Sequence, residues 1–379
     1  MKIAFFSNYM NHHQLPFSNA LIELAESYHF VATKPIPEKK LKFGYADMNN
    51  LPFIVRAYEP NLHNRVNDLL TESDVVIFGD GIDNYIPQRM QHDKLSFLFS
   101  ERFFKKGWWQ RFKPTTRKRI ARKTSAFNGK NYHLLCAGAY VAGDARSTGF
   151  KNNCYRWGYL PEVEKYDADH LLGKKQSQAC VKLLWVGRFL PWKRPQDAIA
   201  LANQLKILNL PFELEMVGAG KVEPKLRKLI DRYDLKKHVK LTGSVTPGQV
   251  REKMKQASIF LMTSDFHEGW GAVINEAMNS CCCVIASRAA GSVPTLIEHQ
   301  QNGLIFEPGK ISQLCKLTED AIRSEMLRET LGRNAYHTMT DLWNAPVAAK
   351  RLVELSESLL TGEDFKLPAC GPISKALEL

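Results

Sequence analysis

The sequence has no apolar run of about 18 residues, the length that a helix needs to cross a lipid bilayer, although 44% of its residues are hydrophobic. It also has no Cys-x-x-Cys pair of the kind that binds structural zinc. Its 8 cysteines include three adjacent ones, Cys281, Cys282 and Cys283, which cannot form an ordinary disulfide framework. We therefore expect no transmembrane span and no zinc site, and buried thiols in a reducing cytoplasm.

Targeting and repeat signals are missing as well. The apolar start of the chain turns polar at Asn8, too soon for a secretory signal peptide, and no short repeat or low-complexity segment occurs. A chain of 379 residues is too long for one ordinary core and predicts two domains. The net charge of +13 favours an anionic partner, such as phosphorylated substrates, a membrane surface or nucleic acid.

Short apolar runs alternate with helical patterns along both halves of the chain, which predicts α/β architecture with doubly wound parallel sheets. We expect strands over 2–7, 29–33, 53–57, 74–79 and 95–100, a strand with its turn over 133–142, and then strands over 181–186, 212–217, 239–242, 259–263, 282–286 and 304–306. The domain boundaries that follow are 1–160, a polar linker over 161–178, and 179–344, with a terminal helix in 345–379.

The stretch 263–278 is the first candidate site. It follows an apolar strand and contains Glu268, a glycine-rich turn and the start of a helix that includes Glu276. Free amide groups and the helix dipole at such a corner bind anions. A phosphate pocket flanked by two carboxylates suits a nucleotide-sugar, with one acid for sugar hydroxyls and one for ribose. Two solvated surface glutamates are the alternative.

Arg188 and Lys193 follow another strand of the same predicted sheet, so they lie at the same edge as Glu268. Two cations there neutralise a diphosphate as it leaves, and Gly187 permits close backbone approach. The alternative is that both charges are solvated ahead of a helix. Gly218-Ala-Gly220 lacks the third glycine of a dinucleotide-binding fingerprint.

Polar residues also follow strands in the first half. Asn11, His12 and His13 come after the first strand, and Glu101 follows the strand over 95–100. Both positions belong to the carboxyl edge, where ligands bind. We expect contacts to the sugar or acceptor there, with a polar loop and a Glu–Arg surface pair as the alternatives. Adjacent histidines are not expected to share a face, so we predict no metal site.

Residues 102–123 are rich in lysine and arginine, contain no acid, and include Phe103, Phe104, Trp108, Trp109 and Phe112. Basic residues interleaved with aromatic ones are typical of docking on anionic lipid, where each cation adds roughly 1 kcal/mol. Single-stranded nucleic acid uses the same residue types. A basic helix that packs on the protein through its aromatic side chains is the third possibility.

Several of these motifs occur together in an order that resembles the retaining glycosyltransferases of family 4. They are Gly187-Arg188 with Lys193, the Gly218-x-Gly220 turn, the E-x7-E pair Glu268 and Glu276, Gly291-Ser-Val-Pro and Asn302-Gly303-Leu304. The resemblance is strongest over residues 181–310. It implies the GT-B fold, in which two Rossmann-like domains face a central cleft and the last helix crosses back to the first domain.

The resemblance also implies roles for individual residues. Arg188 and Lys193 would hold the diphosphate, Glu268 would contact the transferred sugar, and Glu276 would contact the ribose. Further donor contacts are implied at Gly187, Gly218, Ser244, Val245, His267, Gly269, Trp270, Gly271 and Ala272. The family needs no metal and no cofactor, and the leaving phosphate serves as the base. UDP or GDP is the expected nucleotide of the donor.

Two positions depart from the family pattern. Asn11 to Gln14 stand where a Gly-Gly loop often follows the first strand, and Glu101 stands near where many members have a histidine. We expect His12, His13 or Glu101 to take over those contacts.

The function that these features predict is transfer of a sugar to a glycan or lipid-linked acceptor in bacterial cell-surface polysaccharide or lipopolysaccharide synthesis. The enzyme would act in the cytoplasm, on the inner face of the plasma membrane, and would bind no nucleic acid. The alternatives are a non-hydrolysing nucleotide-sugar epimerase, a nucleic-acid-binding protein that uses residues 102–123, and a nucleotide-sugar binder without turnover.

Overall fold

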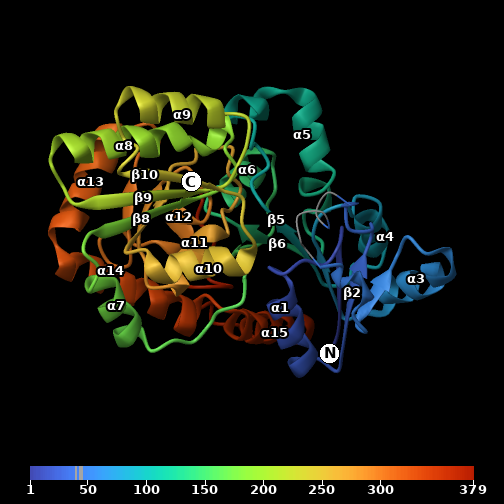
Figure 1. Ribbon diagram of the computed structural model, residues 1–379. Helices are drawn as coiled ribbons and strands as arrows, with labels where there is room; N and C mark the ends of the chain where they lie inside the picture. The colour runs from blue at the N-terminus through green and yellow to red at the C-terminus, as the bar shows by residue number, and fades with distance from the viewer. Residues whose placement is uncertain (39–40, 42–45) are drawn as a thin grey trace. The chain divides into compact units, whose positions relative to one another are not determined.

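The computed structural model describes residues 1–38, 41 and 46–379. The chain divides into two compact units (Figure 1). Unit 1 comprises Met1–Glu162 and Trp343–Leu379, and unit 2 comprises Val163–Leu342. Each unit contains one sheet of parallel strands with helices between successive strands, so the expected α/β architecture is confirmed.

The sheet of unit 1 has the strand order β3-β2-β1-β4-β5-β6-β7. Its strands are β1 (Lys2–Ser7), β2 (Ser27–Ala32), β3 (Ile54–Arg56), β4 (Val75–Phe78), β5 (Ser96–Ser100), β6 (Tyr132–Ala137) and β7 (Cys154–Trp157). The central strands are continuous apolar runs because helices cover both faces of the sheet. Strand β4, for example, is buried at all four of its residues.

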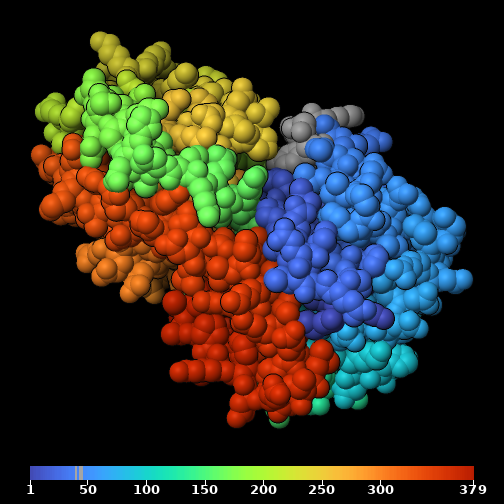
Figure 2. Space-filling view, turned by 90° about the horizontal axis from the view of Figure 1, so that it is seen from below, coloured from blue at the N-terminus to red at the C-terminus, as the bar shows by residue number. Residues whose placement is uncertain are grey.

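The helices of unit 1 include one from the far end of the chain. They are α1 (Leu15–Leu24), α3 (His63–Glu72), α4 (Tyr85–Gln91), α5 (Pro114–Ala121), α6 (Val141–Ser147) and α15 (Ala345–Thr361), with short 3-10 turns η1 (Met48–Asn50), η2 (Pro60–Leu62), η3 (Trp108–Phe112) and η4 (Ser125–Phe127). Helix α15 packs against α1, and in Figure 2 the red C-terminal surface adjoins the dark blue N-terminal one.

The sheet of unit 2 has the order β10-β9-β8-β11-β12-β13. Its strands are β8 (Val181–Val186), β9 (Phe212–Val217), β10 (Val239–Gly243), β11 (Ile259–Met262), β12 (Cys283–Ser287) and β13 (Leu304–Phe306). Because β8 and β11 are neighbours, the loops that follow them lie side by side at the carboxyl edge. This pairing brings together chain segments about 75 residues apart in sequence, as the Lys193–Glu268 contact illustrates.

The helices of unit 2 are α7 (Ala168–Gln176), α8 (Pro195–Ile207), α9 (Glu223–Arg232), α10 (Pro247–Gln256), α11 (Val273–Asn279), α12 (Val293–Leu296), α13 (Ile311–Arg323) and α14 (Glu325–His337), with the short turns η5 (Pro191–Lys193) and η6 (Thr338–Leu342). Trp185 on β8 is among the largest fully buried side chains. Among the described residues, no helix is both long and apolar enough to cross a membrane.

Two parts of the chain differ from the sequence expectation. Helix α7 forms within the stretch assigned to a linker, and its Leu171 and Leu172 are buried. Strand β7 was not expected. Within 133–142, a strand is followed by a turn, as expected: the strand ends at Ala137, Gly138 adopts a positive φ, and helix α6 begins at Val141. Ser324 ends α13 and caps α14.

Candidate functional site

The loop after β8 and the loop after β11 meet in an ion pair between Lys193 and Glu268. Both side chains are nearly enclosed, with exposures of 15% and 14%. The Ser264 hydroxyl donates a further hydrogen bond to the Glu268 carboxylate at 3.0 Å. The sequence placed both residues at one site but assigned Lys193 to the diphosphate and Glu268 to the sugar. The structure adds that each residue is the counter-ion of the other.

A buried hydroxyl fixes the Lys193 loop to the end of β11. Thr263, 1% exposed, accepts a hydrogen bond from the Trp185 indole N–H at 2.9 Å. Its own proton lies within reach of the Lys193 carbonyl at 2.8 Å and the Arg194 carbonyl at 3.0 Å. Arg194 has a positive φ of 49°, which is rare outside glycine, so the loop is held in a strained conformation. The sequence placed Thr263 at the start of the candidate stretch but gave it no role, because a threonine after a strand carries no signal of this contact.

Arg188 lies beside this pair and is exposed. Its guanidinium carbon is 5.6 Å from the centre of the Trp192 ring, as is the Lys193 ammonium group. Among the residues that the structure describes, no carboxylate forms an ion pair with Arg188. The corner therefore has one cation that is already neutralised and one that is available to an anion.

Glycines are required where the β9 loop passes the β8 loop. A Cβ atom on Gly218, whose φ is +142°, would lie 1.9 Å from the Gly187 carbonyl oxygen. Gly271 has a φ of +88°, and a Cβ there would meet the Met262 side chain at 2.4 Å. These contacts explain two of the glycines singled out in the sequence: backbone must pass where no side chain fits.

The turn before α11 offers free amide groups. The carbonyls of Gly269 and Trp270 accept hydrogen bonds from Gly291 and Ser292, at 3.1 and 3.2 Å. By contrast, the amides of Gly271 and Ala272 donate to no other described residue. The Trp270 ring is buried, and its N–H donates to Asn275 at 2.9 Å, which fixes the turn. Such an arrangement binds an anion without a protein counter-ion.

Glu276 lies on α11 with Arg251 of α10 as its nearest cation, 4.0 Å away. Burial raises the pKa of Glu276, and Arg251 opposes that rise. Arg251 also donates to Asn279 at 2.7 Å, so it bridges the two helices. Sequence reasoning did not single out Arg251, because a lone arginine on a helix is usually solvated.

The remaining donor candidates lie on the same edge of unit 2. Ser244 and Val245 form the loop after β10, just before the Thr246 cap of α10. The His267 ring turns back on Asp265, which accepts from its Nδ1 at 2.8 Å. With Gly187, Gly218, Gly269 and Ala272, these positions run from β10 across to β11, as expected for a ligand that spans the edge.

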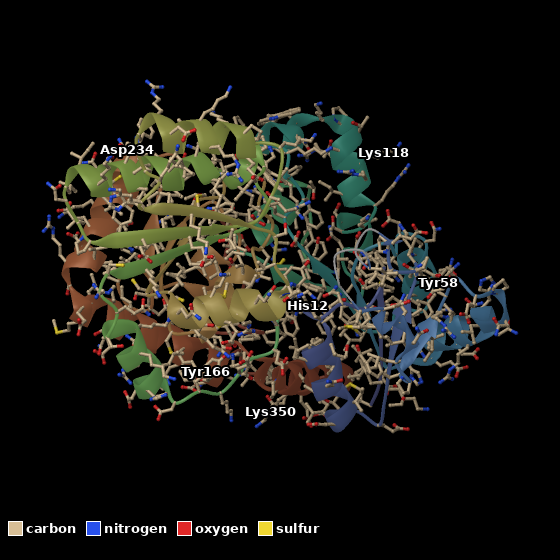
Figure 3. All side chains as sticks on the ribbon, in the orientation of Figure 1. His12, Tyr58, Lys118, Tyr166, Asp234 and Lys350 are labelled. Carbon is tan, nitrogen blue, oxygen red and sulfur yellow. The ribbon has the colours of Figure 1, made fainter. Side chains whose placement is uncertain are left out.

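Unit 1 has a cavity of about 620 Å³ at its own carboxyl edge, lined by loops after β1, β4 and β5 and by helix α5. Asn11, His12, His13 and Glu101 all line it. His12, labelled in Figure 3, and His13 have ring centres only 3.8 Å apart, contrary to the expectation that they diverge, because they lie in a turn rather than a strand. The four acceptor-side candidates therefore share one pocket.

The pocket contains charged pairs that the sequence could not reveal. Glu101 forms an ion pair with Lys105, and Lys123 with Asp83. Tyr159 lies beside Glu101, and burial, followed by that carboxylate, raises the pKa of Tyr159. The Asn11 side chain has a structural role, since it donates to Gln14 at 2.8 Å and accepts from the His13 amide at the start of α1.

The aromatic and apolar side chains of residues 102–123, the basic aromatic stretch, divide into a buried group and an exposed group. Phe104 and Ile120 are 2% and 3% exposed and pack inside unit 1, whereas Trp108 and Phe112 are 63% and 65% exposed. Trp109 is 45% exposed. Basic residues cover these outer rings, with Arg111 5.3 Å from the centre of Trp108. Lys118, labelled in Figure 3, is exposed on the neighbouring helix α5. We call Trp108, Trp109 and Phe112 the aromatic patch.

Residues 174–338 match the family model described as Glycosyl transferases group 1. Among curated proteins, the chain is 25% identical over 183 residues to the phosphatidylinositol N-acetylglucosaminyltransferase GPI3 subunit of Saccharomyces cerevisiae, covering 48% of this chain and 40% of that protein. It is 27% identical over 184 residues to the amylovoran biosynthesis glycosyltransferase AmsK of Erwinia amylovora, covering 47% and 45%. The matches therefore span less than half the length of these relatives.

Among solved structures, the chain is similar to Alr3699/HepE of Anabaena, which was crystallised with UDP. The TM-score is 0.70 at 16% identity, covering 94% of this chain and 100% of the other. This likeness extends over both units and confirms the GT-B fold class. Residues 174–338 are thus similar to the glycosyl transferases group 1 family, and the chain has the GT-B fold.

Proposed function

We propose that the protein is a retaining, metal-independent transferase of the family 4 type, and that it moves a sugar from a nucleoside-diphosphate donor to a glycan or lipid-linked acceptor. The observation that carries the proposal is the corner of unit 2, where the Lys193–Glu268 pair lies beside Arg188, which forms no ion pair with any described carboxylate. Cations and free amides at one sheet edge suit a diphosphate, and a carboxylate next to them suits sugar hydroxyls.

The donor diphosphate would bind Arg188, Lys193 and the amides of Gly271 and Ala272. Negative charge builds on this diphosphate as the bond from the anomeric carbon to the phosphate oxygen breaks. Two cations at the diphosphate stabilise that charge, which is the role a divalent metal has in other transferases. We therefore propose that neither metal nor cofactor is needed, and that UDP or GDP is the nucleotide.

Glu268 would bind the transferred sugar. A diphosphate at Lys193 competes with Glu268 for the ammonium group, which leaves carboxylate lone pairs for sugar hydroxyls. Ser264 still donates to the same carboxylate and fixes its orientation. Glu276 would accept from the ribose hydroxyls, with Arg251 holding its position. In a retaining transfer, the acceptor hydroxyl attacks from the face of the leaving group, and its proton passes to the leaving phosphate oxygen.

The acceptor would bind in the pocket of unit 1. His12, His13, Glu101 and Tyr159 line it with hydrogen-bonding groups of both kinds, as polyhydroxylated ligands require. The exposed aromatic patch and its lysines and arginines would hold the protein on anionic lipid at the inner face of the plasma membrane. AmsK acts in amylovoran biosynthesis; for this chain, we infer a role in bacterial surface polysaccharide or lipopolysaccharide assembly.

A panel of UDP-, GDP-, ADP- and CDP-sugars tests the proposal by thermal shift, followed by product analysis with candidate acceptors. One donor should raise the melting temperature, and a product with retained anomeric configuration should form without added metal. Conversion of the donor with no acceptor present would instead indicate an epimerase. Binding without any turnover would leave only a nucleotide-sugar binder.

A further inference from the structure

Strand β9 has an alternating pattern that is unusual for a parallel sheet. Its sequence is Phe212-Glu-Leu-Glu-Met216, in which the apolar residues are buried, Glu213 is exposed and Glu215 is partly so. Parallel strands covered on both faces are apolar throughout. The alternation therefore indicates that one face of the sheet is left open at the β9–β10 edge.

The structure agrees with this reading. Helices α8 and α9 lie along one side of β8–β10, and α10 lies along the other (Figure 1). Phe212, Leu214 and Val239 pack under α8 and α9 in the core. On the other face, Lys182 is in register with Glu213, and Lys240 with Glu215. In the described part of the chain, the end of α10 borders that face, where a groove of about 430 Å³ remains.

The groove is strongly basic. Its lining contains five lysines and two glutamates. They are Lys182, Lys236, Lys237, Lys240 and Lys253, and Glu213 and Glu215. Two of the lysines are neutralised, Lys253 by Glu215 and Lys236 by Asp231. Lys182, Lys237 and Lys240 form no ion pair with any residue in the described part of the chain. Glu213, which also lines the groove, offsets part of this charge, and Lys240 and Lys237 lie near Glu215 and Asp234. The five lysines still outnumber the two glutamates, and this excess of positive charge attracts an anion.

The groove is separate from the donor corner. Lys182 stands at the start of β8 and Arg188 just beyond its end, so about 20 Å of strand lies between them. A volume of about 430 Å³ falls within the range of ligand pockets. The occupant is therefore neither the donor diphosphate nor a part of it.

We propose that this groove binds an anionic glycan, a chain that bears carboxylate or phosphate groups, apart from the transfer site. The proposal rests on the proposed function, because a transferase of surface polysaccharides meets such chains as acceptor or product. No exposed large hydrophobic residue lines the groove among the described residues, which disfavours insertion into a membrane. One face of the His238 ring is stacked on Phe212, with ring centres 5.0 Å apart, which disfavours a role for His238 as a platform for base stacking.

Fluorescence anisotropy with labelled oligogalacturonate tests the proposal, with a phosphate-bearing glycan as a second probe and a neutral maltooligosaccharide of equal length as reference. The test variant is Lys182→Gln/Lys237→Gln/Lys240→Gln. The control, Lys174→Gln/Lys225→Gln/Lys228→Gln, removes the same charge from exposed positions of unit 2. We expect the groove variant to bind at least about tenfold more weakly, because it lacks three cations, and the control to bind as the wild type does.

Either charged probe supports the proposal if it binds and the neutral one does not. Equal loss in both triple variants, or wild type that binds neither charged probe, would overturn it. So would wild type that prefers single-stranded DNA or phosphatidylglycerol vesicles in a manner that depends on the same three lysines. Thermal shift with the nucleotide-sugar panel runs in parallel: a missing donor response with intact glycan binding refutes the proposed transferase and leaves the groove site standing.

Discussion

Replacement of Thr263 by valine removes one hydroxyl that links Trp185 to the Lys193 loop. The shape of the side chain is kept, but the buried Trp185 N–H and the carbonyl of Lys193 or Arg194 lose their partner. An unsatisfied buried polar group costs about 1–3 kcal/mol. We therefore expect the free energy of unfolding to fall by about that amount.

The effect on transfer should be larger than the effect on stability suggests. The loop carries Lys193, and a displacement of about 1 Å at a reacting centre can cost on the order of a hundredfold in rate. We expect kcat/KM for the donor to fall by about ten- to a hundredfold in Thr263→Val, with weaker UDP binding. The assays are steady-state kinetics at a temperature well below unfolding, UDP titration calorimetry and thermal denaturation.

The conservative Thr263→Ser variant is the matched control, since it keeps the hydroxyl and loses one methyl group. It should retain kcat/KM within about threefold while losing about 1 kcal/mol of stability through the lost methyl contact. If Thr263→Val transfers sugar as fast as the wild type, or if serine is as damaging as valine, the hydroxyl does not position Lys193.

Three further predictions concern other parts of the molecule. Glu268→Ala should lower transfer by at least about a hundredfold, because Glu268 is assigned to the sugar, while UDP affinity is kept or increased, because Lys193 loses its competing counter-ion; normal turnover would refute that role. Burial lowers the pKa of His133 from 6.5 to about 4, so the unfolded state binds a proton before the folded state does as the pH falls. The contribution of neutral His133 to the free energy of unfolding is therefore full above pH 6.5 and is lost as the pH falls toward 4. At about 1.4 kcal/mol per pKa unit, that contribution to the free energy of unfolding is at most about 3.5 kcal/mol, and His133→Phe should flatten the acid side of the stability profile, whereas exposed His92→Phe should not. Trp108→Ser/Trp109→Ser should reduce sedimentation with anionic vesicles while leaving donor binding unchanged; wild type that never sediments with such vesicles would contradict membrane docking.

Runs of apolar residues made most of the fold predictable. Residues such as Ile3 to Phe6 or Val75 to Phe78 are apolar throughout because helices cover both faces of their sheet. Strand β7 was missed because Cys154-Tyr-Arg-Trp157 is short and contains a charge. Helix α7 was missed because its few apolar residues show no clear helical period, and its burial depends on a neighbour from α14, Tyr336.

The candidate site was predictable as far as its motif reaches. The positions of Arg188, Lys193 and Glu268 at one edge follow from strands ending before them. The ion pair between Lys193 and Glu268 does not, since it depends on β8 and β11 being neighbours in the sheet. The sequence also did not show which aromatic side chains of residues 102–123 are buried, because tertiary packing decides that Phe104 is buried and Phe112 is exposed.

The central claim is that Arg188 and Lys193 bind a diphosphate. Calorimetry tests it most directly, by titration of the protein with the cognate nucleoside diphosphate and, separately, with the free nucleoside. The variant is Arg188→Gln/Lys193→Gln, and Lys225→Gln/Lys228→Gln is the charge-matched control. Two lost charge-assisted contacts at about 1.5–3 kcal/mol each predict at least a hundredfold weaker diphosphate binding in the first variant, with nucleoside affinity unchanged. An unchanged affinity for the diphosphate, or an equal loss in the control, would contradict the assignment of this corner as the donor site.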